Sequence, residues 1–355
     1  MGKLTPMLRQ FQKIKENYDD AILFFRLGDF YEMFFEDALE ASEILDITLT
    51  SRDGGKNQKV PMCGVPYHAA ETYIIKLIKA GKKVAICEQI EDHYETPSLL
   101  KREVVKVITP GTVVDPQMLD AGSNNYIVSL VYDNDKIGLS YADVSTGRLK
   151  TTEFEISQGE TFTNEIYRLD PAEFIVCNNF IKLSIWGELK EQFPKVLVNE
   201  ADSNTGNYKR YEQLILEHFH LHSLKAFGCQ HLTAGLKAAG ELIKYLKNNQ
   251  KANLSHFTKI APYNTGEYMI LDPKTKDHLE LSCKSQKKTL LKILDKTCTA
   301  TGARFLKDMI GQPLMNIDKI NQRLDAVEEM KNNLFLRKKL SSHLKNIYDL
   351  ERLIS

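Results

Sequence analysis

The chain of 355 residues carries 47 Lys and Arg against 47 Asp and Glu, and 43% of its residues are hydrophobic. This length exceeds what one hydrophobic core usually organises, so we expect two or three domains. Zero net charge excludes a general cationic attraction to polyanions, and any nucleic-acid binding must come from local patches. The sequence has no signal peptide or apolar membrane span, and its six scattered cysteines suit reduced thiols, which together predict a cytoplasmic protein.

The first 115 residues alternate between helical and strand-like patterns. Thr5 followed by Pro6 signals a helix start, and the apolar run at 21–27 predicts a buried strand that ends at Gly28. A turn then leads to an amphipathic helix at 34–45. The later predicted elements are a short strand at 46–50, a loop at 51–59, a bend at 61–66, a helix at 68–80, and strands at 83–90 and 102–109. Residues 1–115 are therefore predicted to form a mixed α/β domain.

Two further domains are predicted after a polar, turn-rich linker at 116–124. A hairpin around the turn at 133–135 and a strand at 173–177 continue an α/β pattern, which gives a second domain at 125–255. From Asp295 onward the pattern is helical and reaches Ser355 without a stop signal. We therefore expect a helical domain at 256–355 that continues beyond the last residue.

Phe30 and Glu32 follow the turn at Gly28, and each has two interpretations. An exposed Phe can wedge between base steps in the minor groove, whereas composition alone favours a buried core aromatic. Asp29 and Glu32 also fit a capping box at a helix N-terminus. On a strand, residues 30 and 32 would share a face, whereas on a helix they would point apart. The sequence alone leaves this choice open.

Several long segments, in order, resemble the bacterial MutS mismatch-recognition family. They are LGDFYEMFFEDA at 27–38, VPMCGVPYHAAETYIIKLIKAGKKVAICEQIED at 60–92 and VVKVITPGT at 104–112, followed by IGLSYADVSTGRL, SLKAFGCQHLTAGLKAAGELIKYL, MILDPKTKDHLELS and TATGARFLKDMIGQPL. The resemblance implies a multidomain α/β fold. Its parts would be a mismatch-binding domain at 1–115, a ribonuclease-H-like connector at 125–255 and the first part of a helical lever domain at 256–355.

The resemblance also implies roles for individual residues. Phe30 would insert beside a mispaired base, and Glu32 would hydrogen-bond that base, for which we hypothesise that its carboxyl binds a proton. Arg52 and Arg102 would contact the DNA backbone, with Lys106 as a basic neighbour. Because unstacking costs least where pairing is already defective, such a wedge would select weak base pairs.

For the whole protein, the resemblance implies a DNA-bending homodimer with a later domain that binds ATP and magnesium. It further implies a MutL-type partner on the connector domain and association with the bacterial nucleoid. This chain contains no G-x-x-x-x-G-K-[ST] motif, so we expect neither a cofactor nor enzyme activity within it.

The sequence leaves three alternatives open. A MutS paralogue could clamp branched recombination DNA without reading mismatches, although Phe30 and Glu32 argue against this. A metal-dependent nuclease could use Asp143, but it would need further carboxylates nearby. A zinc site is the third alternative, if alternating strand residues share a face, with its ligands drawn from His218, His220, His222, Cys229 and His231.

Overall fold

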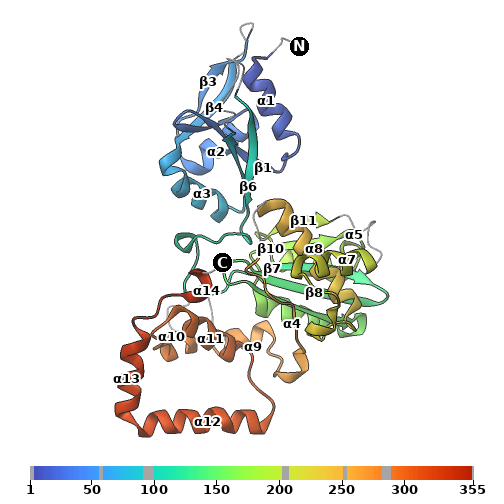
Figure 1. The fold of residues 1–355 in the computed structure, drawn as a ribbon, viewed down its shortest axis with the longest axis vertical. Coiled ribbons are helices and arrows are strands. Elements are labelled where there is room, and N and C mark those ends of the chain that lie inside the picture. The colour runs from blue at the N-terminus through green and yellow to red at the C-terminus, as the bar shows by residue number, and fades with distance from the viewer. Residues whose placement is uncertain are drawn as a thin grey trace. The chain divides into compact units, whose positions relative to one another are not determined.

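The computed structural model of the chain (Figure 1) describes residues 4–55, 59–90, 100–201, 208–250, 254–281 and 289–353. The chain folds as two units, one made of residues 1–112 with 245–254 and the other of residues 113–244 with 255–355. Each unit contains a six-stranded sheet. The predicted multidomain, mixed α/β class is confirmed.

The first unit is a sheet with helices on both faces. Its strand order is β3-β4-β2-β1-β5-β6, with β1 parallel to β5 and antiparallel to β2. The strands are β1 (Ala21–Leu27), β2 (Phe30–Phe34), β3 (Thr50–Asp53), β4 (Lys59–Pro66), β5 (Lys83–Gln89) and β6 (Arg102–Ile108), and the helices are α1 (Pro6–Lys15), α2 (Glu36–Leu45) and α3 (Ala70–Lys79).

Helix α1 covers one face of this sheet, while α2 and α3 cover the other. The α1 side chain Phe11 packs edge-on against Phe25 and Phe34, with ring centroids 5.5 and 5.2 Å apart. Pro6 occupies the first turn of α1, where its missing N–H costs no helical hydrogen bond. On the other face, the thiol of Cys63 donates to the carbonyl of Ala38 in α2.

The structure corrects four sequence predictions in this unit. The predicted turn between Gly28 and the helix contains strand β2, and the predicted bend at 61–66 lies inside strand β4. The strand expected at 46–50 begins only at Thr50 and continues to Asp53, into the loop predicted at 51–59. The aromatic residues of β2 also fit a helical repeat, which hid the strand. Pro61 is tolerated in β4 because its missing N–H faces Phe35, just past the end of β2 at Phe34, and its carbonyl accepts a hydrogen bond from the backbone N–H of Phe35.

The second unit has the strand order β11-β10-β7-β8-β9-β12. Its strands are β7 (Ile127–Asp133), β8 (Lys136–Asp143), β9 (Arg148–Glu155), β10 (Glu173–Cys177), β11 (Leu197–Ala201) and β12 (Ala261–Pro262). The predicted hairpin is confirmed, because β7 and β8 meet at Asn134 and Asp135, which both have positive φ as a type I′ turn requires.

Helices accompany this sheet and dominate the chain after residue 264. They are α4 (Gly159–Leu169), α5 (Asn178–Ile181), α6 (Ser184–Gln192), α7 (Tyr208–Phe219), α8 (Thr233–Gln250), α9 (Pro273–His278), α10 (Leu290–Leu294), α11 (Ala300–Gly311), α12 (Ile317–Asn332), α13 (Leu334–Leu344) and α14 (Leu350–Leu353). The predicted helical character of the C-terminal region is confirmed.

Buried arginines tie α11 and α14 to the segment before β7. Arg304 in α11 is 1% exposed, and its guanidinium donates to both carboxylate oxygens of Asp349 at 2.7 Å and to the carbonyl of Ala121 at 3.0 Å. Arg352 in α14 donates to the carbonyl of Ser123 at 2.7 Å. Such paired, hydrogen-bonded charges fix geometry, because removing one partner leaves the other buried without compensation.

Two further sequence expectations concern thiols and membranes. Free thiols are present at Cys63, Cys87, Cys177 and Cys229, all buried, and at the partly buried Cys298, whereas Cys283 lies outside the described residues. None of the described helices is long and apolar enough to cross a membrane.

Close packing between β8 and α8 gives a test of the second unit. A Cβ atom added at Gly138 would lie 2.0 Å from the carbonyl oxygen of Ala234, so Gly138→Ala should destabilise this unit by about 3 kcal/mol. Gly187 in α6 is the control, because a Cβ there meets nothing within 4 Å, and Gly187→Ala should stabilise by up to about 1 kcal/mol. Urea unfolding followed by the fluorescence of Trp186 measures both; equal midpoints would contradict the packing.

Candidate nucleic-acid interface

A two-residue turn places Phe30 at the tip of the β1–β2 hairpin. Gly28 has φ +59°, a conformation that glycine adopts without strain at the first central position of such a turn. Phe30 is the first residue of β2 and pairs with Leu27 of β1 and Pro66 of β4. The backbone N–H of Tyr67 donates to the carbonyl of Asp29 at 2.9 Å, which fixes the turn from the β4 side.

The alternation of side chains along β2 puts Phe30 and Glu32 on one face. Tyr31 and Met33 are buried on the opposite face, whereas Phe30 is 46% exposed and Glu32 is partly exposed. Phe30 is therefore not a core aromatic. The capping-box interpretation of Glu32 is wrong, because α2 begins only at Glu36, after Phe35 as its N-cap.

Glu32 forms an ion pair with Arg52. The Nη1 atom of Arg52 donates to Oε2 of Glu32 at 2.6 Å, although the two residues lie on β3 and β2 with β4 between them. Gly64 of β4 pairs with Glu32 and presents no side chain on this face, so the arginine can reach across it. The side chain of Arg52 is 42% exposed and that of Glu32 is 17% exposed.

The buried side of the hairpin holds this arrangement in place. The hydroxyl of Tyr31 donates to the carboxylate of Glu88 on β5. Burial, followed by the hydrogen bond and charge of Glu88, raises the pKa of Tyr31 to about 12, so the phenol stays neutral at physiological pH. The guanidinium of Arg26 lies 3.7 Å from the ring centre of Tyr67. No local pattern in the sequence predicts this support, because its partners are distant in sequence.

Arg102 and Lys106 both lie on β6, in different surroundings. Arg102 is only 7% exposed, and its guanidinium donates to the carbonyl of Arg26 at 2.8 Å and to the side-chain carbonyl of Gln10 at 3.0 Å. It also lies 4.9 Å from the ring centre of Phe25, and burial lowers its pKa. These contacts commit Arg102 to the fold, and its burial argues against the predicted contact with a phosphate. Lys106 is partly exposed.

Three family models match the chain in succession. MutS domain I matches residues 5–117, MutS domain II matches residues 125–258 and MutS domain III matches residues 274–355. The chain belongs to the MutS family. The hairpin that presents Phe30 and Glu32 lies within the part that matches MutS domain I.

Similar curated MutS proteins match the whole chain. Each is named DNA mismatch repair protein MutS: that of Halothermothrix orenii is 46% identical over 364 residues, that of Lachnoclostridium phytofermentans 44% over 360, and that of Listeria welshimeri 46% over 359. The alignments cover 99–100% of this chain but only 38–40% of those proteins. The chain thus spans about two fifths of the length of these MutS relatives.

In this MutS chain, the surroundings of Asp143 are those of a structural carboxylate. Asp143 is fully buried, and its oxygens accept from the backbone N–H and hydroxyl of Ser145, at 3.0 and 2.6 Å, and from the backbone N–H of Asn125 at 3.2 Å. Among the described residues, no group of three or more His, Cys, Asp and Glu is arranged to hold a metal ion. The described geometry therefore gives no support to a nuclease centre.

The premise of the zinc alternative is wrong. His218 lies in the last turn of helix α7, and His220 follows it with a left-handed backbone at φ 53°. These residues therefore do not alternate along a strand, as shared ligation from one strand face would require.

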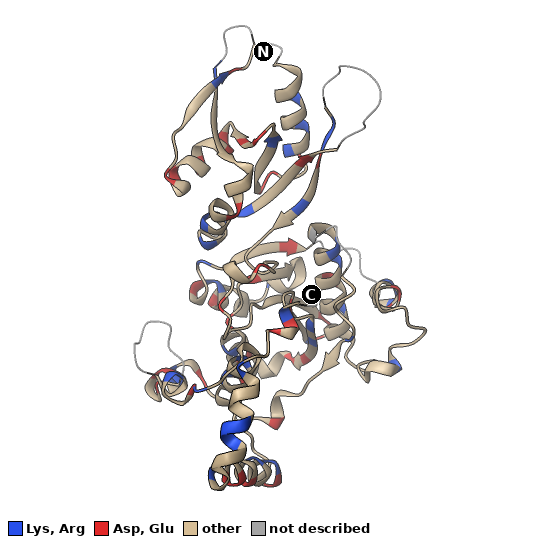
Figure 2. Cartoon of the chain, turned by 60° about the vertical axis from the view of Figure 1, so that its left-hand side comes forward, with Lys and Arg blue, Asp and Glu red and all other residues tan. Residues whose placement is uncertain are grey.

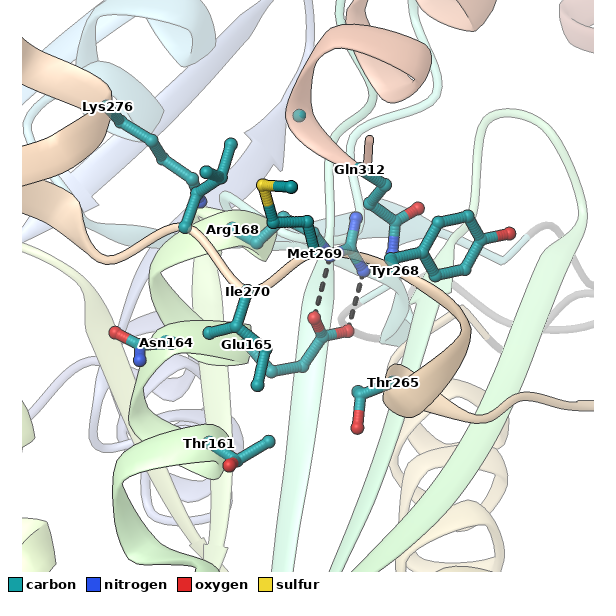
Figure 3. A pocket seen from close by; sticks show the side chains of 12 residues that line it. Thr161, Asn164, Glu165, Arg168, Thr265, Tyr268, Met269, Ile270, Lys276 and Gln312 are labelled. Atoms are coloured by element: carbon teal, nitrogen blue, oxygen red, sulfur yellow. Dashed lines mark hydrogen bonds and ion pairs between the residues drawn. The ribbon is translucent and has the colours of Figure 1, made fainter. Parts of the chain in front are cut away.

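Ion pairs line two hollows in the described part of the chain. The cavity between α4 and the 265–276 segment (Figure 3) has a volume of only about 30 Å³, and Arg168 donates to both carboxylate oxygens of Glu165 at 2.7 Å beside it. A hollow of about 560 Å³ lies at the end of β1 away from Phe30, and its lysines pair with acidic neighbours, as Lys15–Asp37, Lys82–Glu40 and Lys83–Asp20. Neither resembles the mostly apolar pocket that a small ligand prefers.

Charged residues of both signs are scattered over both units (Figure 2), in keeping with the zero net charge. The hairpin face is therefore distinguished by its exposed aromatic ring and its Glu32–Arg52 pair, and not by an excess of positive charge.

The exposure of Phe30 predicts how two neighbouring aromatics respond to truncation. Phe30→Ala should change the free energy of unfolding by less than about 1 kcal/mol, because its ring is half exposed. Phe34→Ala, at the buried end of the same strand, should cost about 3–5 kcal/mol. Native-state hydrogen exchange of the β1 amides measures both variants. A loss in Phe30→Ala as large as in Phe34→Ala would contradict the described hairpin.

Proposed function

We propose that this chain binds duplex DNA and senses mispaired bases through the tip of the β1–β2 hairpin. The observation that carries the proposal is the exposed Phe30, with Glu32 on the same face, in a segment that matches MutS domain I. The ring of Phe30 follows a tight turn, and buried side chains on the opposite face of β2 hold that strand in place. Such a ring is suited to enter a weakened base stack.

The selectivity follows from the energy of deforming DNA. Inserting a ring between base steps costs a few kcal/mol of unstacking, and less where pairing is already defective. A mispair also makes the duplex easier to bend, and a protein can sense this deformability without hydrogen bonds that identify particular bases. Phe30 would therefore test deformability, and Glu32 would add a hydrogen bond to the mispaired base. One probe could then detect many kinds of mispair.

Binding by this chain should be weak and salt-sensitive. Arg52 and Lys106 are the basic side chains of the first unit that we propose to contact phosphates, and such contacts position a duplex without reading its sequence. With zero net charge, the chain gains little long-range attraction to DNA. Most of the discrimination must then come from the hairpin itself.

For the whole protein, we propose the activities of a complete MutS: a homodimer that bends DNA and uses ATP and magnesium in a domain outside these residues. A MutL-type partner would contact the part that matches MutS domain II. The protein would then act in the bacterial cytoplasm, on the nucleoid. These proposals rest on the similarity to longer MutS relatives.

The proposed wedge is tested by binding of Phe30→Ala to matched and mismatched duplexes. The ratio of the two affinities should fall to about one, while weak, salt-sensitive binding remains, because phosphate contacts do not depend on the ring. Leu49→Ala is the control, since Leu49 is a similarly exposed apolar side chain of the same unit and its loss should leave the ratio unchanged.

Fluorescence anisotropy with labelled duplexes, including a four-way junction, provides the measurement. Mismatch preference that survives in Phe30→Ala would refute the wedge. Wild-type protein that binds the junction but does not distinguish the two duplexes would favour a clamp on branched DNA instead.

A further inference from the structure

The ion pair between Glu32 and Arg52 joins the two side chains to which we assign different parts of the DNA. Arg52 is a proposed phosphate contact, and Glu32 is a proposed base contact, yet they bind each other at 2.6 Å. Among the described residues, Arg52 is the ion-pair partner of Glu32. An arginine bound to a carboxylate has fewer donors to offer a phosphate, and its charge is locally cancelled.

We propose that Arg52 is a positioning residue that exchanges partners, binding Glu32 on matched DNA and a phosphate on mismatched DNA. This inference rests on the proposed mismatch-sensing function and adds a selection step to it. The exchange needs no movement of the strands, because Arg52 is the more exposed partner and lies on β3 at the edge of the sheet.

The electrostatics of the pair favour this order of events. On a matched duplex, the stacked bases give Glu32 no partner, so releasing Arg52 would leave an uncompensated carboxylate close to phosphates. The pair therefore stays closed, and the face presents a neutral surface. Where Phe30 opens a mispair, the base itself becomes a hydrogen-bond partner for Glu32. Arg52 is then free to bind a phosphate, so that base contact and backbone contact form together.

The dependence of affinity on salt distinguishes exchange from an ordinary phosphate contact. Log affinity falls with log salt concentration, and each phosphate contact adds about 0.9 to the magnitude of that slope. Arg52→Ala should therefore reduce the magnitude of the slope for mismatched DNA by about 0.9 and leave the slope for matched DNA unchanged. Glu32→Gln should increase the magnitude of the slope for matched DNA by about 0.9, because it releases Arg52, and the double variant Glu32→Gln with Arg52→Ala should abolish that increase.

The experiment measures binding of the chain to matched and mismatched duplexes over a salt series. Lys59→Ala is the control, because Lys59 lies on β4, which pairs with the strand that carries Arg52. Any change that Lys59→Ala makes to the slope should be the same for matched and mismatched DNA. Equal melting temperatures of all variants would show that the exposed edge has not unfolded. The affinity for matched DNA should rise about fivefold in Glu32→Gln, the scale of an exposed ion pair.

Two outcomes would overturn the exchange. If Arg52→Ala lowers both slopes equally, Arg52 is a constant phosphate contact; if it lowers neither, Arg52 contacts no phosphate. Failure of the proposed function looks different, because wild-type chain would then show equal affinities for the two duplexes before any variant is compared.

Discussion

The alternation of side chains along the five residues of β2 is the constraint on which the site depends. Tyr31 and Met33 are buried on the face of the sheet that α2 and α3 cover, and this burial places Phe30 and Glu32 on the opposite face, at the end of β2 away from the buried Phe34. Shifting the register by one residue would bury Phe30 and expose Met33. The turn at Gly28 and the pairing of Phe30 with both Leu27 and Pro66 prevent such a shift. The core thus decides which side chains DNA can meet.

The cations of the first unit divide by burial into two kinds. Arg102 is enclosed by backbone carbonyls and the ring of Phe25, so its charge supports β6. Arg52 lies at the sheet edge with an acidic partner and remains accessible. Both are arginines near strand ends, and no pattern in the sequence separates them. In the second unit, Arg304 is a buried, structural arginine like Arg102, because its ion pair fixes α11 to Asp349.

The sequence predicted the fold where one pattern dominated. The apolar run of β1 matched its bounds, and Pro6 marked the start of α1, because these signals are local. Strand β2 was not predicted, since its aromatic residues also fit a helical repeat and the choice depends on pairing with β4. Strand β4 was taken for a bend because it contains Pro61 and Gly64, which are tolerated there only through its neighbours.

The site was predicted only in part, and for a similar physical reason. The resemblance to MutS selected Phe30 and Glu32, whereas composition and local spacing alone favoured a core ring and a capping carboxylate. The Glu32–Arg52 ion pair and the contact between Tyr31 and Glu88 join residues on different strands. Such contacts follow from sheet order, which a single sequence does not display. The burial of Arg102 likewise depends on contacts with Gln10 of α1 and Arg26 of β1, which lie far from β6 in the sequence.

Contact between residue 30 and the mispair itself is the central claim, and site-specific crosslinking measures it most directly. Benzoyl-phenylalanine in place of Phe30, with the same group at exposed Leu49 as control, can be irradiated on a duplex that carries one mispair. The account predicts crosslinks from position 30 concentrated at the mispaired bases and their neighbours, and none concentrated there from position 49. Crosslinks from position 30 spread evenly along the duplex, or absent from the mispair, would contradict it.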